Sequence, residues 1–133
     1  MPYLHLKLSA LPADELANQL AAALTDLTVD VLKKKRELTA VTVEQLSHER
    51  WFIGGEALAN RSQQSFYLDI RVTAGTNTKD EKAEYIARVF AAMASRLGAV
   101  AAASYVVIHE VPAEGWGYEG QTQEFRYIKG RAM

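Results

Sequence analysis

Apolar and polar side chains alternate along short stretches of the chain, with the two-residue period of a strand that has one buried face. The first stretch shows this most clearly, because Leu4, Leu6 and Leu8 share one face and the residues between them share the other. Other stretches are rich in β-branched residues, which favour strands. The pattern predicts four strands, at residues 3–8, 38–46, 66–72 and 104–111.

Longer stretches between these strands carry apolar residues three and four positions apart, which is typical of a helix with one buried face. The first stripe consists of Leu16, Leu20, Leu24, Leu27 and Val31, and the second of Ile86, Val89, Phe90, Met93 and Leu97. Pro12 suits the first turn of the first helix. Thr78 and Glu81 have the spacing of a capping box, and Gly98 is positioned to end the second helix.

A basic run closes the first predicted helix, at residues 33–36 (Lys-Lys-Lys-Arg). Positive charge at a helix C-terminus complements the helix dipole, and such a run also suits the binding of an anion. The sequence leaves both roles open.

The two halves of the chain repeat each other about 65 residues apart. Tyr3-Leu4 matches Tyr67-Leu68, Asp14-Glu15 matches Asp80-Glu81, and Trp51 matches Trp116, each tryptophan lying near glycines. A strand–helix–strand unit of this length predicts parallel strands joined by a right-handed crossover. Each unit is too small to bury its own sheet and helix well, so the two are expected to share one sheet.

The expected fold is therefore α+β, with duplicated β-α-β units forming a four-stranded mixed sheet and two helices on one face. Residues 1–133 form a single domain in this interpretation, with halves at about 1–60 and 61–133 and a linker over residues 57–65. The opposite sheet face carries Tyr3, His5, Lys7, Tyr67, Asp69 and Arg71. It packs against other subunits or faces water, and the pattern does not decide between them.

Composition limits the classes of function that are expected of the chain. The net charge of −1 gives no electrostatic case for binding nucleic acid or a membrane surface. The chain has no cysteine, and its three histidines do not have the spacing of metal ligands, so neither thiol catalysis nor a metal site is expected. No secretory signal or membrane-length apolar run is apparent, and a cytoplasmic location is expected.

Pro2 carries the main chemical hypothesis. If Met1 is removed, Pro2 presents a secondary amine at the head of the first strand. Burial in a partly apolar pocket disfavours the charged form of an amine and lowers its pKa. A neutral amine near pH 7 is a usable general base.

Several motifs together resemble the 4-oxalocrotonate tautomerase family, in its fused or duplicated form. They are Met1-Pro2-Tyr3, the β-α-β unit, Trp51-Phe52-Ile53-Gly54-Gly55-Glu56, Glu110-Val111-Pro112-Ala113 and Trp116-Gly117-Tyr118. The resemblance covers nearly the whole chain. It implies an isomerase that assembles as a homotrimer and uses its N-terminal proline to move protons next to a carbonyl. The implied substrate is a small carboxylic or keto acid, and no metal or organic cofactor is implied.

The resemblance also bears on the residues around the base. Trp51 matches an aromatic that lines the pocket in the family, and by internal symmetry so does Trp116. Arginines that the family uses to hold carboxylates are absent near Pro12, Ala40, Thr76 or Asn77, and Tyr105, and also from residues 73–76. Arginine is suited to bidentate binding of a carboxylate. A dicarboxylate substrate held in the way that is usual for the family is therefore not expected.

Other side chains are candidates to replace those arginines. Arg50 and Arg71 are candidates by proximity in sequence, Tyr105 is a possible donor to a carbonyl oxygen, and the run at residues 33–36 is a candidate to act across a subunit boundary. The second half begins with Phe66 and offers no second amine, so one catalytic proline per chain is expected.

Three functions remain open at this point. The first is proline-based enol–keto tautomerisation of small enol or 2-keto acids. The second is another proline-dependent reaction, namely hydration, dehalogenation or decarboxylation of a small unsaturated or 3-oxo acid. The third is a non-catalytic member of the fold, because a fold does not fix a function.

Overall fold

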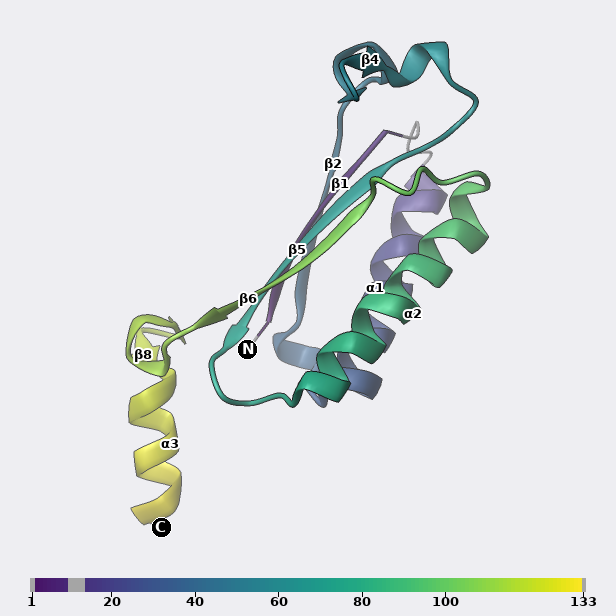
Figure 1. Cartoon of the computed structure of the whole chain (residues 1–133). Helices are drawn as coiled ribbons and strands as arrows, with labels where there is room; N and C mark the ends of the chain where they lie inside the picture. The colour runs from purple at the N-terminus through teal and green to yellow at the C-terminus, as the bar shows by residue number, and fades with distance from the viewer. Residues whose placement is uncertain (1, 10–13, 133) are drawn as a thin grey trace.

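The computed structural model describes residues 2–9 and 14–132 (Figure 1). The main elements are β1 (Tyr3–Leu8), α1 (Asp14–Leu32), β2 (Ala40–Gln45), β5 (Phe66–Thr73), α2 (Lys79–Leu97), β6 (Tyr105–Val111) and α3 (Gln123–Ala132). Two short hairpins complete the fold, β3–β4 (Phe52–Ile53 and Glu56–Ala57) and β7–β8 (Gly117–Tyr118 and Gln121–Thr122). The expected turn at Pro12 lies outside the described residues.

The four long strands form one mixed sheet in the order β2-β1-β5-β6. Strand β1 runs parallel to β2 and antiparallel to β5, and β5 runs parallel to β6. Tyr3 pairs with Ala40 on one side and Arg71 on the other. The starts of β1 and β2 therefore share one end of the sheet with the ends of β5 and β6. The expected four-stranded mixed sheet is confirmed.

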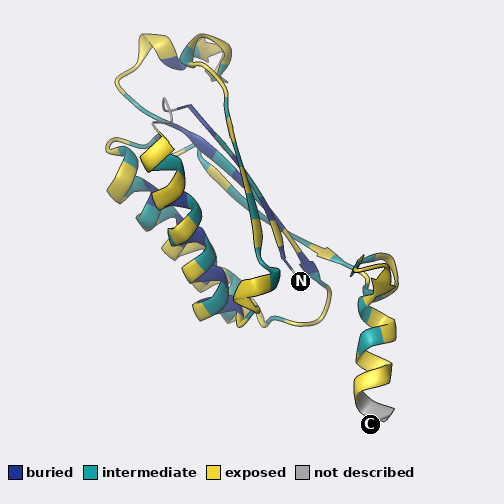
Figure 2. Ribbon diagram, turned by 180° about the vertical axis from the view of Figure 1, so that it is seen from behind, coloured by how far each residue is buried: buried dark blue, intermediate teal, exposed yellow. Residues whose placement is uncertain are grey.

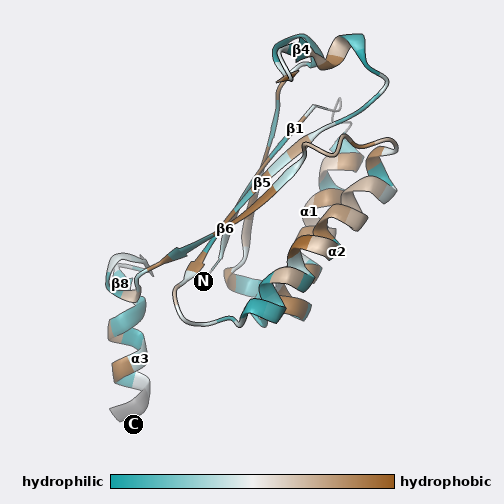
Figure 3. Cartoon of the chain, in the orientation of Figure 1, coloured by the Kyte–Doolittle hydropathy of each residue, from teal (hydrophilic) through white to brown (hydrophobic). Residues whose placement is uncertain are grey.

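Both long helices cover the same face of the sheet, and the core lies between the two layers (Figure 2). The alternation in β1 puts Leu4, Leu6 and Leu8 into this core with no exposed surface. The helices alternate between hydrophobic and hydrophilic positions (Figure 3), and Leu20, Leu24, Val89 and Met93 are among the hydrophobic ones that join the core. Burying apolar surface from two layers is the main stabilising term of such a fold.

The ends of α2 follow its sequence signals. The Thr78 hydroxyl accepts a hydrogen bond from the Glu81 N–H at 3.1 Å, and the Glu81 carboxylate accepts one from the Thr78 N–H at 2.8 Å, which completes the capping box. Gly98 has φ of 85°, a backbone conformation that suits glycine, and it caps the C-terminus of the helix.

One position of the expected α2 stripe is wrong. Ile86 is 41% exposed, and the neighbouring Tyr85 is fully buried in its place. The Tyr85 hydroxyl lies 2.9 Å from the Thr28 hydroxyl, which itself donates to the Leu24 carbonyl at 2.7 Å. A tyrosine is tolerated in the core here because its hydroxyl has a partner on α1.

Three boundaries also differ from the expectation. The second strand is shorter than predicted, because a 3₁₀ turn (Arg36–Leu38) precedes it and Leu46 lies beyond it. The expected linker contains a 3₁₀ turn (Leu58–Asn60) with Leu58 fully buried. Helix α3 was not predicted at all, and it stands apart from the α1–α2 layer (Figure 1).

The hairpins repeat the same local structure at opposite ends of the sheet. The Trp51 carbonyl accepts a hydrogen bond from the Leu58 N–H at 2.8 Å, and the Trp116 carbonyl accepts one from the Gln123 N–H at 2.8 Å. Each hairpin therefore reproduces the repeat seen in the sequence. Within the described residues, neither long helix has the length and apolarity needed to cross a membrane.

Burial raises the pKa of Tyr85 to about 12, which makes the alkaline stability of the fold testable. The folded pKa lies above the unfolded value, so the stabilisation is fully present below about pH 10 and is lost as the pH rises toward 12. Between pH 9 and pH 11 the wild type should lose about 1 kcal/mol more unfolding free energy than Tyr85→Phe. Urea unfolding at both pH values measures this, with the exposed Tyr105→Phe as control; equal losses in all three proteins would contradict it.

Candidate active site

Pro2 lies at the head of the central strand β1 and is buried. Its carbonyl accepts a hydrogen bond from the Ala40 N–H at 3.3 Å. Because Tyr3 pairs with Arg71, Pro2 lies at the sheet end where β5 leaves the sheet. The chain between β5 and α2, residues 74–78, passes this end, and we call it the 74–78 loop.

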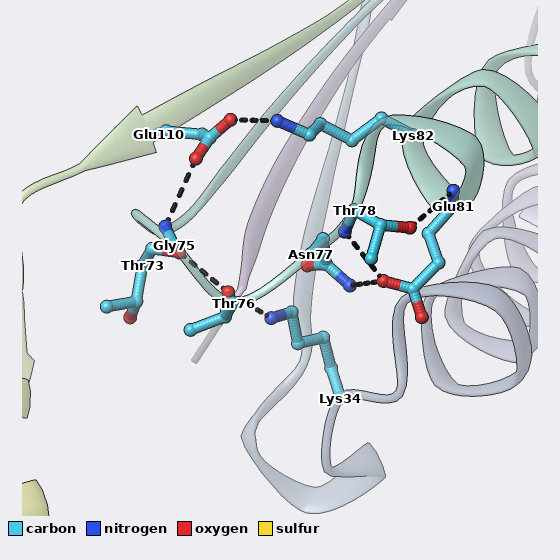
Figure 4. A network of polar contacts seen from close by, with 9 residues as sticks. All are labelled: Lys34, Thr73, Gly75, Thr76, Asn77, Thr78, Glu81, Lys82 and Glu110. Carbon is cyan, nitrogen blue, oxygen red and sulfur yellow. Dashed lines mark hydrogen bonds and ion pairs between the residues drawn. The ribbon is translucent and has the colours of Figure 1, made fainter.

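Hydrogen bonds hold the 74–78 loop against β6 and against itself. The Ala74 N–H donates to the Val111 carbonyl at 2.8 Å, and the Gly75 N–H donates to the Glu110 carboxylate at 3.2 Å. The Thr76 hydroxyl donates to the Thr73 carbonyl at 2.6 Å. These contacts hold the loop in place (Figure 4), at the end of the sheet where β1 begins.

Lys34 reaches this loop from the end of α1. The helix ends at Leu32, and Lys33 turns the chain with φ of 60°. The Lys34 ammonium then donates to the Thr76 hydroxyl at 2.8 Å. Burial lowers the pKa of Lys34 from its ordinary value, while the negative charges of Glu81 and Glu110 act in the opposite direction.

The two carboxylates near Lys34 are each engaged by other donors. Hydrogen bonds from Lys82 and then from the Gly75 N–H hold the pKa of Glu110 below its usual value. Hydrogen bonds from the Thr78 N–H and then from the Asn77 side chain lower the pKa of Glu81. Both carboxylates therefore stay ionised and favour a positive charge on Lys34.

Two clefts meet at Lys34, with volumes of about 480 and 530 Å³. Both are lined by Lys34, Gln123 and Tyr127, so α3 of the same chain forms a wall of each. The first cleft also contains the exposed Lys33 and Lys35, and the second contains Thr73 and the start of the 74–78 loop. Arg126 adds a further positive charge to the first cleft, whereas the second also carries the Glu124 carboxylate.

A smaller cavity of about 250 Å³ lies on the open face of the sheet. It is lined by Tyr3, His5, Asp69, Arg71 and Trp116. The Asp69 carboxylate lies 3.7 Å from the Arg71 guanidinium and 2.8 Å from His109 Nε2, the latter without hydrogen-bond geometry. Two of the predicted site residues, Arg71 and Trp116, are thus brought together at the Pro2 end.

The other predicted residues lie at the far end of the sheet. Tyr105 begins β6, opposite Tyr67, and is 56% exposed. Arg50 and Trp51 follow the end of β2. Arg50, Trp51 and Tyr105 therefore do not join Pro2 within one chain. Within the described ranges, 2–9 and 14–132, no group of three or more His, Cys, Asp and Glu residues is arranged to hold a metal ion.

Comparison with known proteins identifies the family of this chain. A family model described as "Tautomerase enzyme" matches the chain twice, over residues 2–61 and again over residues 67–126. The chain belongs to the tautomerase family. "Probable tautomerase K2" of Dickeya dadantii (strain 3937) is 33% identical over 67 residues, which are 49% of this chain and 98% of that protein.

Solved structures resemble the whole of this tautomerase. A native fused 4-OT has 29% identity and a TM-score of 0.82, covering 92% of this chain and 97% of that one. A fused 4-OT described as an asymmetric trimer has 24% identity and a TM-score of 0.81, covering 93% and 98% of the two chains. The second of these supports the fold alone.

In the second half of this tautomerase, the position that corresponds to Pro2 lies inside the chain. Its equivalent position, Phe66, is fully buried, and the residues before it continue the chain. Gln64 donates to the Ala99 carbonyl and accepts from the Ala101 N–H, each at 2.8 Å, and the Ser65 carbonyl accepts from the Ser9 N–H at 3.1 Å. This end of the sheet is filled by the chain itself.

Part of this site is predictable from the sequence. The basic run at residues 33–36 suits an anion, but nothing in it distinguishes Lys34, whose contact with Thr76 spans 42 positions. Gln123 and Tyr127 were not considered, because their helix is short and mostly polar. The one available signal for Lys34 was its place just beyond an apolar stripe that must pack on the sheet.

Gly117 fixes the hairpin that follows Trp116. A Cβ added to Gly117 would lie 2.3 Å from the Gln121 carbonyl oxygen, which is a backbone atom of the paired strand. We expect Gly117→Ala to open the hairpin, to withdraw Trp116 from its cavity and to cost about 1–3 kcal/mol. Trp116 fluorescence in a Trp51→Phe background measures this change.

Gly115→Ala is the matched control, because a Cβ there meets nothing within 4 Å. It should leave the fluorescence of Trp116 as in the parent. An unchanged emission spectrum in Gly117→Ala would show that the hairpin accommodates a side chain and would contradict the prediction.

Proposed function

We propose that this tautomerase catalyses enol–keto proton transfer on small enol or 2-keto acids, with the Pro2 amine as general base once Met1 is removed. The observation that carries the proposal is the burial of Pro2 at a sheet end bordered by a fixed loop and a partly buried cation. The family membership supports the reaction class.

The environment of Pro2 suits a neutral amine. Burial disfavours the protonated form of an amine. A neutral amine near pH 7 is a usable base. A primary amine at this position would be less constrained, because the ring fixes the nitrogen relative to the strand.

The proposed step conserves every atom. The neutral Pro2 nitrogen takes the proton of the enol hydroxyl, and the resulting enolate is held by donors of the site. The same nitrogen, now an ammonium, returns the proton to carbon and becomes neutral again. The C=C bond of the enol is replaced by the C=O bond of the ketone, and no redox partner is required.

We also propose a homotrimer as the working form. Fused 4-OT structures similar in fold are trimers, both symmetric and asymmetric. Tyr3, Tyr67 and Tyr105 lie on the open sheet face, and β2 and β6 are unpaired sheet edges. In this assembly Arg50, Trp51 and Tyr105 would serve the Pro2 site of a neighbouring copy, whereas Arg71 and Trp116 would serve their own.

Replacement of the base tests the proposed reaction directly. Protein whose Met1 removal is confirmed by mass should ketonise phenylenolpyruvate, and Pro2→Ala should lower kcat/KM by about 100-fold or more. The reason is that alanine supplies a primary amine that no ring fixes relative to the strand. The rate of ketonisation is followed by ultraviolet absorbance.

The matched control is the same chain with Met1 retained, obtained by inhibiting methionine removal during expression. Its proline ring is intact but its nitrogen is an amide and has no basicity. It should be as inactive as Pro2→Ala while unfolding at the same denaturant concentration as the wild type. Full activity of either protein would exclude Pro2 as the base.

A further inference from the structure

One cation of the basic run at residues 33–36 is left unused by the fold and by the candidate active site. The side chains of the other three bind within the chain, at the Asp30 carbonyl (Lys33, 2.7 Å), the Thr76 hydroxyl (Lys34, 2.8 Å) and the Asp26 carboxylate (Arg36, 2.7 Å). Among residues 2–9 and 14–132, the structure gives the ammonium of the exposed Lys35 no hydrogen bond or ion pair.

Lys35 lines the first of the two clefts, which has a volume of about 480 Å³. The other side of this cleft is formed by α3. Of the described residues that line it, none is acidic and four are cationic, namely Lys33, Lys34, Lys35 and Arg126. The second cleft differs, because it carries the Glu124 carboxylate. A chain with a net charge of −1 thus gathers positive charge from two elements around one cleft.

Arg126 is oriented on the α3 side of this cleft by Tyr118. Its guanidinium lies 3.8 Å from the centre of the Tyr118 ring, and Nη2 donates to the Tyr118 carbonyl at 3.0 Å. The Glu119 carboxylate lies 3.6 Å from Nη2 but is 82% exposed, and such an ion pair is weak.

The guanidinium of Arg126 keeps donors to spare. An arginine has five N–H donors in a planar fork. Within the part of the chain that the structure describes, Nε is shielded from solvent and has no acceptor, and the partners of the guanidinium are all at Nη2. Arg126 is therefore a cation with a fixed plane and unused donors, at a cleft without acidic residues.

The charges around this cleft suit a phosphate group. A phosphate monoester carries a charge of about −1.5 to −2 at pH 7 and three acceptor oxygens, so donors from two sides can bind it at once. Arginine binds two of these oxygens with its planar fork, and lysine supplies a mobile point charge for the third. Leu38, Tyr118 and Tyr127 also line the cleft and offer apolar surface to an organic group on the phosphate.

We propose that the first cleft binds a small phosphate ester, with Arg126 holding the phosphate from α3 and Lys35 from the end of α1. This ligand is distinct from the acid on which Pro2 acts, and its site does not depend on the proposed reaction. The basic run then serves both purposes that its sequence allows. Lys33 binds a carbonyl at the end of α1, whereas Lys35 serves an anion.

Isothermal titration calorimetry with phenyl phosphate tests the site. Arg126→Met should raise Kd by about 10-fold or more, because it removes charge-assisted hydrogen bonds. Lys35→Met should raise Kd by about 3- to 10-fold, since an exposed charge contributes less. The matched control is Lys129→Met, which removes the same charge from an exposed position of α3 that does not line the cleft. Its Kd should stay within about twofold of the wild-type value.

Two further titrations make the result specific. Arg126→Lys keeps the charge but loses the fork and the stacking on Tyr118, so its Kd should rise several-fold even if Arg126→Met disturbs α3. Inorganic phosphate should bind the wild type about 10-fold more weakly than phenyl phosphate, because it has no organic group to contact the tyrosines. Equal affinity for both phosphates would overturn the assignment of an ester.

Other outcomes bear on the position of the site. Absence of saturable binding of phenyl phosphate to the wild type would overturn the proposal, as would equal weakening in Lys129→Met and Arg126→Met. Pro2→Ala should bind phenyl phosphate as the wild type does, because Pro2 does not line this cleft. Loss of binding in Pro2→Ala would place the ligand at the amine and reject the site. These titrations need no turnover, so the proposed reaction and the phosphate site can fail separately.

Discussion

The antiparallel pairing of β1 with β5 is the constraint on which the rest of the structure depends. It joins the two halves into one sheet and sets the start of β1 against the end of β5. A shift by one residue would turn the buried leucines of β1 toward the open face. Because the core leucines fix this register, they also fix Pro2 beside the loop that leaves β5. The location of the site is thus a consequence of packing.

A second link between the halves is polar. Thr28 and Tyr85 join α1 to α2 inside the core, and Lys34 and Thr76 join the end of α1 to the 74–78 loop. Both contacts lie on the seam between the repeated units. The first is buried and contributes to stability, since a buried hydroxyl without a partner would be costly. The second is exposed and holds the Lys34 ammonium against the 74–78 loop.

The elements of the fold followed from the sequence because local patterns determine them. Strand β1 and the capping box of α2 occur as the alternation and the Thr78–Glu81 spacing predict. The exchange of Ile86 for Tyr85 in the core did not follow, because it depends on a hydroxyl partner on another helix. Helix α3 was missed because ten residues of mixed polarity carry little helical signal.

The sequence predicts the candidate site only where a single residue is informative by itself. Pro2 is informative by its position and its chemistry, whereas Arg71 and Trp116 meet Tyr3 only through sheet register and a hairpin. The place of Lys34 at this end of the sheet follows from its three-dimensional contact with Thr76, which no local pattern specifies. Arg50, Trp51 and Tyr105 lie at the other end, so their importance depends on assembly rather than on the fold of one chain.

The closed end of the second half has a consequence for how such a chain can change. Gln64 and Ser65 occupy the place where a free terminus would lie. The 74–78 loop and the end of β6 instead lie at the end of the sheet where β1 begins. The two halves share one fold but contribute different residues to this end of the sheet. Under the proposed function, altered selectivity can therefore arise in the second half while Pro2 in the first half stays unchanged.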